Sequence, residues 1–214
     1  MPFPSPKAID MRQQTITSFL DSLADRSPAP GGGATAALHL GQAAALVAMV
    51  ARYSTGPRYA EHATAVDRIC SSADAIRKRA LGFAEADMAA FTSVIEAYRL
   101  PKAENATART QAIAAALTDA ARVPADVLMS AHEVVKLADE LLPVANPTVI
   151  SDIAAAAEAA RAAATTARVN IEVNLPGIPQ NLARAELLDS LTTVDAAVAH
   201  ADRITTQVRK RLNP

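Results

Sequence analysis

Three consecutive glycines, Gly31 to Gly33, stand between a proline-rich segment and a long run of small and apolar residues. Glycine has no Cβ, so another group can approach the main chain closely here. A helix that begins just after the glycines presents its first N–H groups without partners inside the helix. Such a helix start can bind a carboxylate, a carbonyl oxygen or a developing negative charge. The glycines could equally serve only to let two helices pack closely, and the loop alone favours neither interpretation.

A second candidate is Asp87, which interrupts the apolar face of a predicted long helix. It follows Phe83 by four residues and precedes Phe91 by four, so the three side chains share one face. A carboxylate among apolar neighbours is costly to bury unless it is paired or functional. One interpretation is a partner for an arginine or a helix terminus, which is the commoner outcome. The other is a general acid–base whose pKa is raised by its apolar neighbours.

Polar residues further along the chain are weaker candidates for ligand binding. Asn170 and Asn174 are spaced four apart and flanked by apolar residues, so they could hydrogen-bond across helices or present amides to a heterocycle. Asp152, beside Ser151, is by default a residue of the first turn of a helix. Its carboxylate also matches the paired N–H donors of an aminopyrimidinone ring such as a pterin. Lys102 is most simply a solvated lysine in a turn.

The sequence offers no motif for a metal site or an activated nucleophile. None of the four histidines is paired with another at metal-ligand spacing, so we expect no bound metal. They are His39, His62, His132 and His200. Cys70 is the single cysteine and cannot form an intrachain disulfide, which fits a core residue in a reducing compartment. Because the first residues also lack a signal-peptide pattern, the expected location is the cytoplasm.

Composition sets the broad class. A chain of 214 residues can bury a sizeable core, and one domain spanning residues 1–214 is expected. Half of the residues are apolar but only 3% are aromatic, and Ala fills many positions, which predicts closely packed helices. The net charge of -1 gives no support for binding nucleic acid or an anionic membrane. The most apolar run, residues 34–51, is marginal for crossing a bilayer and is better explained as a buried core helix.

Apolar periodicity predicts an all-α fold, an elongated multihelical bundle of about six long helices separated by turns that contain proline. Residues 1–8 are expected to be extended or disordered, and Pro124 is expected to kink or divide its helix. Residues 168–175 also alternate like a strand, but they are assigned to a helix because a lone strand would have no partner. Since Ala-rich faces bury little within one subunit, we expect dimerisation through helix packing. The predicted helices cover residues 9–24, 34–54, 59–99, 108–142, 148–175 and 181–212.

The chain resembles the formiminotransferase-cyclodeaminase C-terminal domain family, which includes free-standing methenyltetrahydrofolate cyclohydrolases. The resemblance rests on LADRSPAPGGGATAAL, EADMAAF, RLPK, NPTVISD and VNIEVNL, which occur in collinear order over nearly the whole chain. It implies an all-helical dimer that acts on one-carbon-substituted tetrahydrofolate, with no cofactor beyond this substrate, which is possibly polyglutamylated. His39 stands where relatives have a small apolar residue, and its role is left open.

The resemblance also assigns roles to residues. It places the catalytic acid of the family on Asp87, and it makes Lys102 a partner for the glutamate tail of the folate. The glycine loop would bind a folate carbonyl or tail carboxylate, while Asp152, Asn170 and Asn174 would contact the pterin. The full set of implied substrate-binding residues is Ser27, Gly31, Gly32, Gly33, Lys102, Asn146, Ser151, Asp152, Asn170 and Asn174.

The residues and the resemblance leave three hypotheses for the function. The first is formimidoyltetrahydrofolate cyclodeaminase, which closes 5-formimidoyltetrahydrofolate to 5,10-methenyltetrahydrofolate and releases ammonia. The second is methenyltetrahydrofolate cyclohydrolase on the same scaffold. The third, from a different class, is a non-catalytic helical interaction protein, which would bind no folate.

Overall fold

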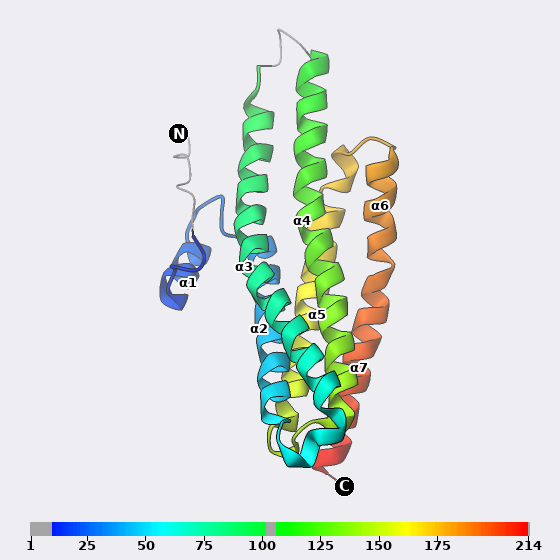
Figure 1. Cartoon of the computed structure of the whole chain (residues 1–214). Helices are drawn as coiled ribbons and strands as arrows, with labels where there is room; N and C mark the ends of the chain where they lie inside the picture. Colours follow the sequence, from blue (N-terminus) through cyan, green and yellow to red (C-terminus); the bar gives the residue numbers. More distant parts are fainter. Residues whose placement is uncertain (1–9, 102–105, 214) are drawn as a thin grey trace.

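The computed structural model describes residues 10–101 and 106–213, and every regular element in these ranges is helical (Figure 1). All the α-helices except the first run side by side as an elongated bundle, which confirms the predicted all-α class. They are α1 (Ile16–Ala24), α2 (Gly32–Tyr53), α3 (Ala63–Arg99), α4 (Ala106–Leu141), α5 (Ile150–Glu172), α6 (Leu182–Leu191) and α7 (Thr193–Leu212). Four short 3-10 turns connect them, η1 (Pro57–His62), η2 (Leu142–Val144), η3 (Pro147–Val149) and η4 (Leu175–Gly177).

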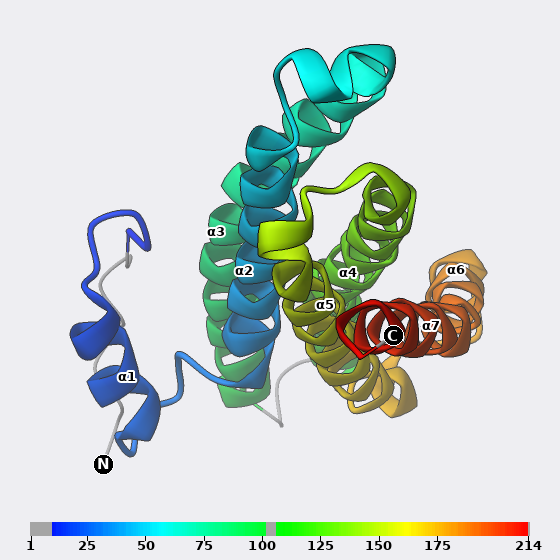
Figure 2. The same ribbon diagram turned by 90° about the horizontal axis from the view of Figure 1, so that it is seen from below.

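Helix α2 lies between α3 and α5 when the bundle is viewed from its lower end (Figure 2). Its small residues allow this packing: a Cβ added at Gly41 would lie 3.4 Å from the Cβ of Ala80 in α3. The expectation that residues 34–51 form a buried core helix is only partly met, because Leu38, Leu46 and Met49 are half-exposed. Among the described helices, α2 alone is long and apolar enough to cross a membrane, and 56% of its most apolar window is buried inside the bundle.

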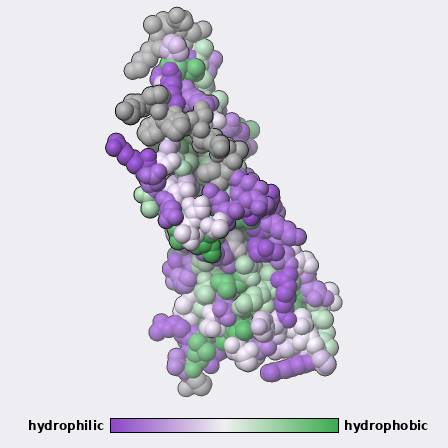
Figure 3. All heavy atoms as spheres, turned by 90° about the vertical axis from the view of Figure 1, so that its left-hand side faces the viewer, coloured by the Kyte–Doolittle hydropathy of each residue, from purple (hydrophilic) through white to green (hydrophobic). Residues whose placement is uncertain are grey.

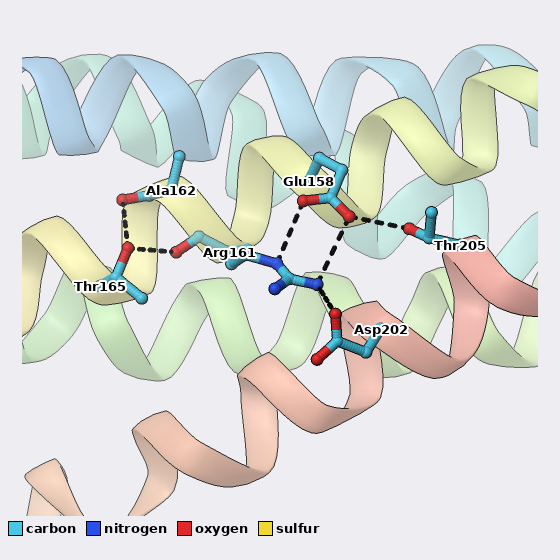
Figure 4. A network of polar contacts seen from close by, with 6 residues as sticks. All are labelled: Glu158, Arg161, Ala162, Thr165, Asp202 and Thr205. Carbon is cyan, nitrogen blue, oxygen red and sulfur yellow. Dashed lines mark hydrogen bonds and ion pairs between the residues drawn. The ribbon is translucent and has the colours of Figure 1, made fainter.

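Helix α5 packs against α2 and α4 through alanines and is joined to α7 by a polar network (Figure 4). The guanidinium of Arg161 forms ion pairs with Glu158 on its own helix and with Asp202 of α7. Thr205 of α7 donates a hydrogen bond of 2.9 Å to Glu158. Because these charges are partly exposed, each pair contributes about 0.2–1 kcal/mol, and the network mainly sets how α7 lies along α5.

Helix α1 stands apart from the bundle (Figures 1 and 2). Phe19 is its buried anchor, whereas Ile16 and Leu20 are 81% and 54% exposed. The predicted first helix is too long: in the described chain a turn occupies residues 11–13 and the helix begins only at Ile16, where the Thr15 side chain caps it by accepting a hydrogen bond from the N–H of Ser18. Residues 1–8 lie outside the described range, so their predicted state stays a prediction.

Two further boundaries differ from expectation for physical reasons. Pro124 lies inside an undivided α4, where it is buried, so core packing offsets the hydrogen bond that proline cannot donate. The predicted last helix is two helices that part at Thr192. There the hydroxyls of Thr192 and Thr193 donate to the carbonyls of Asp189 and Ser190 at 2.7 and 2.8 Å and compete with the helical pattern.

Candidate active site

The glycine loop ends at the N-terminus of α2, as predicted. Gly31 is extended, with φ of −145°, and its carbonyl accepts hydrogen bonds from both the N–H and the hydroxyl of Thr35 at 3.0 Å. Gly32 and Gly33 occupy the first helical positions, and their N–H groups have no partner in the described chain. The loop therefore leaves two donors at the positive end of a helix dipole.

Asp87 of α3 lies directly against this helix start. A Cβ added at Gly33 would fall 1.9 Å from Oδ1 of Asp87 and 2.3 Å from its Cγ. No side chain fits between the two, so Gly33 is required where the carboxyl approaches the backbone. Of the two interpretations of the glycines, close approach of a functional group explains Gly33 better than packing of two apolar helices does.

The environment of Asp87 favours its protonated form. Burial raises the pKa of this carboxyl above its ordinary value, and a hydrogen bond from the backbone of Ala34 opposes that rise. None of the ion pairs in the described chain involves Asp87, so the alternative of an arginine partner does not hold there. A carboxyl with a raised pKa can hold and release a proton nearer to neutral pH.

Asn170 and Asn174 bring two amides to the same place. Their Nδ2 atoms donate to the carbonyls of Thr166 at 2.9 Å and of Asn170 at 2.8 Å, which fixes both side chains along the end of α5. Their Oδ1 atoms have no hydrogen bond within the described chain and remain free acceptors. A Cβ added at Gly32 would lie 3.5 Å from Nδ2 of Asn170, so the amide also borders the glycine loop.

These groups line one cavity of about 380 Å³, which lies among α2, α3, α4 and α5. Its polar groups come from the glycine loop, Asp87, Asn170 and Asn174. The remaining wall is apolar, and it is formed by Pro28, Ala29, Phe91, Val94, Leu117, Ala120 and Val173. A volume of this size, with a few polar groups on an apolar wall, suits a small heterocyclic ligand.

The other predicted binding residues of α5 lie at its opposite end. Asp152 and Asn170 are 18 positions apart on one helix, which corresponds to about 27 Å along the axis. Asn146 accepts from the N–H of Thr148 at 3.0 Å and donates to the carbonyl of Tyr53 at 2.9 Å, so it caps η3 and ties it to the end of α2. Ser151 is exposed in the first turn of α5. Within one subunit, Asn146, Ser151 and Asp152 cannot contact a ligand held by Asn170.

The remaining predicted residues divide as follows. Ser27 does not line the cavity, and its hydroxyl donates to the carbonyl of Ala29 at 2.9 Å, which shapes the loop from outside. Lys102 lies outside the described residues. His39 lies on α2 about two turns beyond the glycines and does not line the cavity. Within the described ranges, no three His, Cys, Asp or Glu side chains come together as a metal site would need.

Sequence reasoning missed the wall that α4 contributes, above all Leu117 and Ala120. Ile113 and Leu117 are the two large apolar side chains in the segment AIAAALTDAA, which marks Leu117 as a packing residue but not as part of a cavity. Val173, which is 70% exposed at the mouth, was noticed only as part of the alternating segment.

Comparisons with known proteins agree on one family. The family model described as formiminotransferase-cyclodeaminase matches residues 15–193. A methenyltetrahydrofolate cyclohydrolase of Methylorubrum extorquens is 34% identical over 204 residues, which cover 94% of this chain and 98% of that protein. The formimidoyltransferase-cyclodeaminase of Rattus norvegicus is 29% identical over 164 residues, or 75% of this chain but only 30% of that larger protein.

A solved structure extends the match to three dimensions. The formiminotetrahydrofolate cyclodeaminase of Thermotoga maritima superposes with a TM-score of 0.85 at 26% identity, covering 94% of this chain and 98% of that one. The family match spans the glycine loop, Asp87 and both asparagines. The chain belongs to the formiminotransferase-cyclodeaminase family, as a folate-dependent one-carbon enzyme of its cyclodeaminase and cyclohydrolase branch.

Proposed function

We propose that the protein is a methenyltetrahydrofolate cyclohydrolase, which adds water to 5,10-methenyltetrahydrofolate and yields 10-formyltetrahydrofolate. The carrying observation is the half-buried Asp87, whose carboxyl lies against Gly33 at the start of α2 and lines a cavity with a largely apolar wall. A relative that is 34% identical over almost the full length of both chains bears this name, whereas the cyclodeaminase structure of equal coverage is 26% identical. This proposal therefore reverses the order of the two enzymes expected from sequence.

In the proposed complex the pterin and its one-carbon bridge fill the cavity. The N–H groups of Gly32 and Gly33 bind a carbonyl or carboxylate oxygen of the folate, since helix starts favour negative groups. The free Oδ1 atoms of Asn170 and Asn174 accept hydrogen bonds from ring N–H groups. Lys102 remains the proposed partner of the glutamate tail, outside the described residues.

Asp87 carries the chemistry in this proposal. The methenyl group is cationic, and an opposite charge in the cavity favours the ionised carboxylate, which takes a proton from the attacking water. The new C–O bond produces a neutral tetrahedral carbon bonded to N5 and N10. The protonated Asp87 then gives its proton to N5 as the C–N5 bond breaks. The hydroxyl on the former methenyl carbon loses its proton to solvent as the C=O bond forms, so the formyl group stays on N10 and one proton is released overall. A raised pKa suits both steps: it makes the Asp87 carboxylate a stronger base for the attacking water, and it keeps the carboxyl protonated until it gives the proton to N5.

The second candidate is the cyclodeaminase, and the Thermotoga maritima structure with that name supports it. Here N10 attacks the formimidoyl carbon on N5, the ring closes, and the amine leaves as ammonia. Asp87 in its protonated form would protonate the leaving amine. The same cavity could serve both reactions, because 5,10-methenyltetrahydrofolate is the product of the cyclodeaminase and the substrate of the cyclohydrolase.

Two assays on the purified protein separate these functions. The first assay measures hydrolysis of 5,10-methenyltetrahydrofolate, through the loss of its absorbance, in excess EDTA. It tests the proposed reaction and whether that reaction needs a metal. Ammonia release from 5-formimidoyltetrahydrofolate tests the second candidate. A protein that performs neither reaction and does not bind folinate would contradict both enzymes and leave the non-catalytic interaction protein.

We also propose that the protein is a homodimer formed through α1 and the outer face of α2. Ile16 and Leu20 of α1 are exposed, and Leu46 and Met49 of α2 are half-exposed. Helix α1 stands apart beside the bundle in both ribbon views. Figure 3 shows that the lower part of this face is largely pale to green, with purple residues mainly along its margins. Light scattering tests the proposal: the wild type should be a dimer, and Leu46→Glu should be a monomer.

A further inference from the structure

The turn that follows α5 approaches the cavity wall at a second glycine. A Cβ added at Gly177, in η4, would lie 2.2 Å from Cδ1 of Leu117 and 3.6 Å from its Cγ. Leu117 is buried and lines the cavity from α4. The missing side chain at position 177 therefore leaves the space that the end of the Leu117 side chain occupies.

A single arginine of α6 holds this turn in place. Nη1 of Arg184 donates to the carbonyl of Leu175 and, at 3.1 Å, to that of Ile178, the residues on either side of Gly177. None of the ion pairs in the described chain involves Arg184, so its guanidinium is left to donate to the carbonyls at the start and the end of η4. The N–H of Gly177 donates to the carbonyl of Asn174 at 3.1 Å, which links the same turn to the polar side of the cavity.

The alternative place for the Leu117 side chain is the cavity itself. Leu117 is surrounded by the close-packed core on its other sides, and interiors of this density have no spare volume for an isobutyl group. A side chain added at position 177 would displace Cδ1, which is the flexible end of Leu117, toward the cavity that Leu117 lines.

We propose that Leu117 determines the size of the ring system that the cavity accepts, and that Gly177 and Arg184 are positioning residues that hold Leu117 out of it. This inference rests on the proposed function, because the ring system in question is the pterin with its one-carbon bridge. Gly177 and Arg184 touch no reacting atom and act through the wall, so their effect is on binding and not on the proton transfers of Asp87.

A double-mutant cycle tests the inference. Dissociation constants for folinate, and KM and kcat for the methenyl substrate, are measured for wild type, Gly177→Ala, Leu117→Ala and the double variant. Gly177→Ala should weaken folinate binding and raise KM roughly 5- to 100-fold, as overpacking does, with kcat at saturation nearly unchanged. In the Leu117→Ala background the same glycine change should have almost no effect. An equal loss in both backgrounds would overturn the proposal.

Two controls keep the outcome decisive. Gly82→Ala adds the same methyl group on α3 where nothing lies within 4 Å, and it should leave all constants unchanged. If Gly177→Ala does not fold, Arg184→Met takes its place: it should raise KM with kcat retained, and unchanged folinate binding would contradict the proposal.

A crystal structure of Gly177→Ala separates this inference from the proposed function. Leu117 turned into the cavity supports the inference even if the wild type neither binds folinate nor turns over a folate. Leu117 unmoved, with the η4 backbone displaced instead, overturns it even if the protein proves to be an active cyclohydrolase.

Discussion

The two ends of the α2–α5 pair carry similar residues and use them differently. At one end, the start of α2 meets Asp87 and the amide of Asn170. At the other, the end of α2 meets Asn146 and the start of α5, which carries Asp152. Each end combines a helix N-terminus, an asparagine and an aspartate, and motifs of the family cover both.

The difference lies in where the hydrogen bonds go. The side chain of Asn146 accepts from Thr148 and donates to the carbonyl of Tyr53, and its own N–H donates to the buried Ser54. Both partners of each of these hydrogen bonds belong to the protein, and the bonds join η3 to the end of α2. At the cavity end, the acceptors of the asparagines and the donors of the glycine loop stay open. The groups around Asn146 satisfy one another and are structural, whereas the groups left open toward the cavity can bind a ligand.

If the cavity end is the active site, the largest loss of activity is expected on substitution of Asp87. Asp87→Asn should retain the fold, because the amide oxygen can still accept the hydrogen bond from Ala34. It should lower kcat by about 10²–10⁴-fold, the usual contribution of a general acid–base. Turnover of methenyltetrahydrofolate with circular dichroism as the folding control measures both. A normal kcat would remove Asp87 from the mechanism even though the family assignment stands.

A smaller loss of activity is expected when the carboxyl is displaced and not removed. Gly33→Ala places a methyl group where Oδ1 of Asp87 now lies, so the carboxyl must move and kcat should fall by about 10- to 100-fold. Gly82→Ala, also close to Asp87 along the chain but in open space, should retain full activity. Equal behaviour of the two variants would show that close approach at Gly33 does not matter.

The raised pKa of Asp87 also predicts how stability depends on pH. Between its unfolded and folded pKa values the native state holds more protons at this site than the unfolded chain does, so the site's contribution to stability falls as pH rises through this window. Asp87→Asn has no ionisable group at this site, so its stability does not fall for this reason as pH rises. Its melting temperature should exceed that of wild type at pH 7, and the two should converge at acidic pH, where Asp87 is protonated in both states. A melting temperature below wild type at pH 7 would contradict burial as the dominant cause.

Much of this arrangement could be predicted from sequence, and the misses have identifiable causes. Turn prolines and apolar periodicity are local signals, and they placed the helices that carry the glycine loop, Asp87 and Asn170. The break at Thr192 depends on hydroxyls that compete with backbone groups, which periodicity does not register. Leu117 was missed because its role arises from contact with Gly177, 60 positions away. The remoteness of Asp152 was already implicit in the single predicted helix over residues 148–175.

At the closed end, the expected effect is on stability alone. Asn146→Ala removes the cap of η3 and the bond to Tyr53, which should lower the free energy of unfolding by about 1–2 kcal/mol. Urea unfolding measures this loss, and kcat/KM of the folded variant should equal that of wild type. A tenfold loss of kcat/KM without loss of stability would place this end in the active site.

The smallest effect is expected for Asp152→Asn, and it is the sharpest test of the separation between the ends. The side chain of Asp152 makes no hydrogen bond or ion pair within the described chain, and about 27 Å of helix separates it from Asn170. The change should remove only the interaction of a carboxylate with the start of α5, worth about 0.3–1 kcal/mol and weakened by added salt. KM and kcat should stay at wild-type values. A rise in KM that persists in high salt, from a variant of unchanged stability, would mean that the start of α5 in a second subunit reaches the cavity, so the two ends would form one site across the dimer.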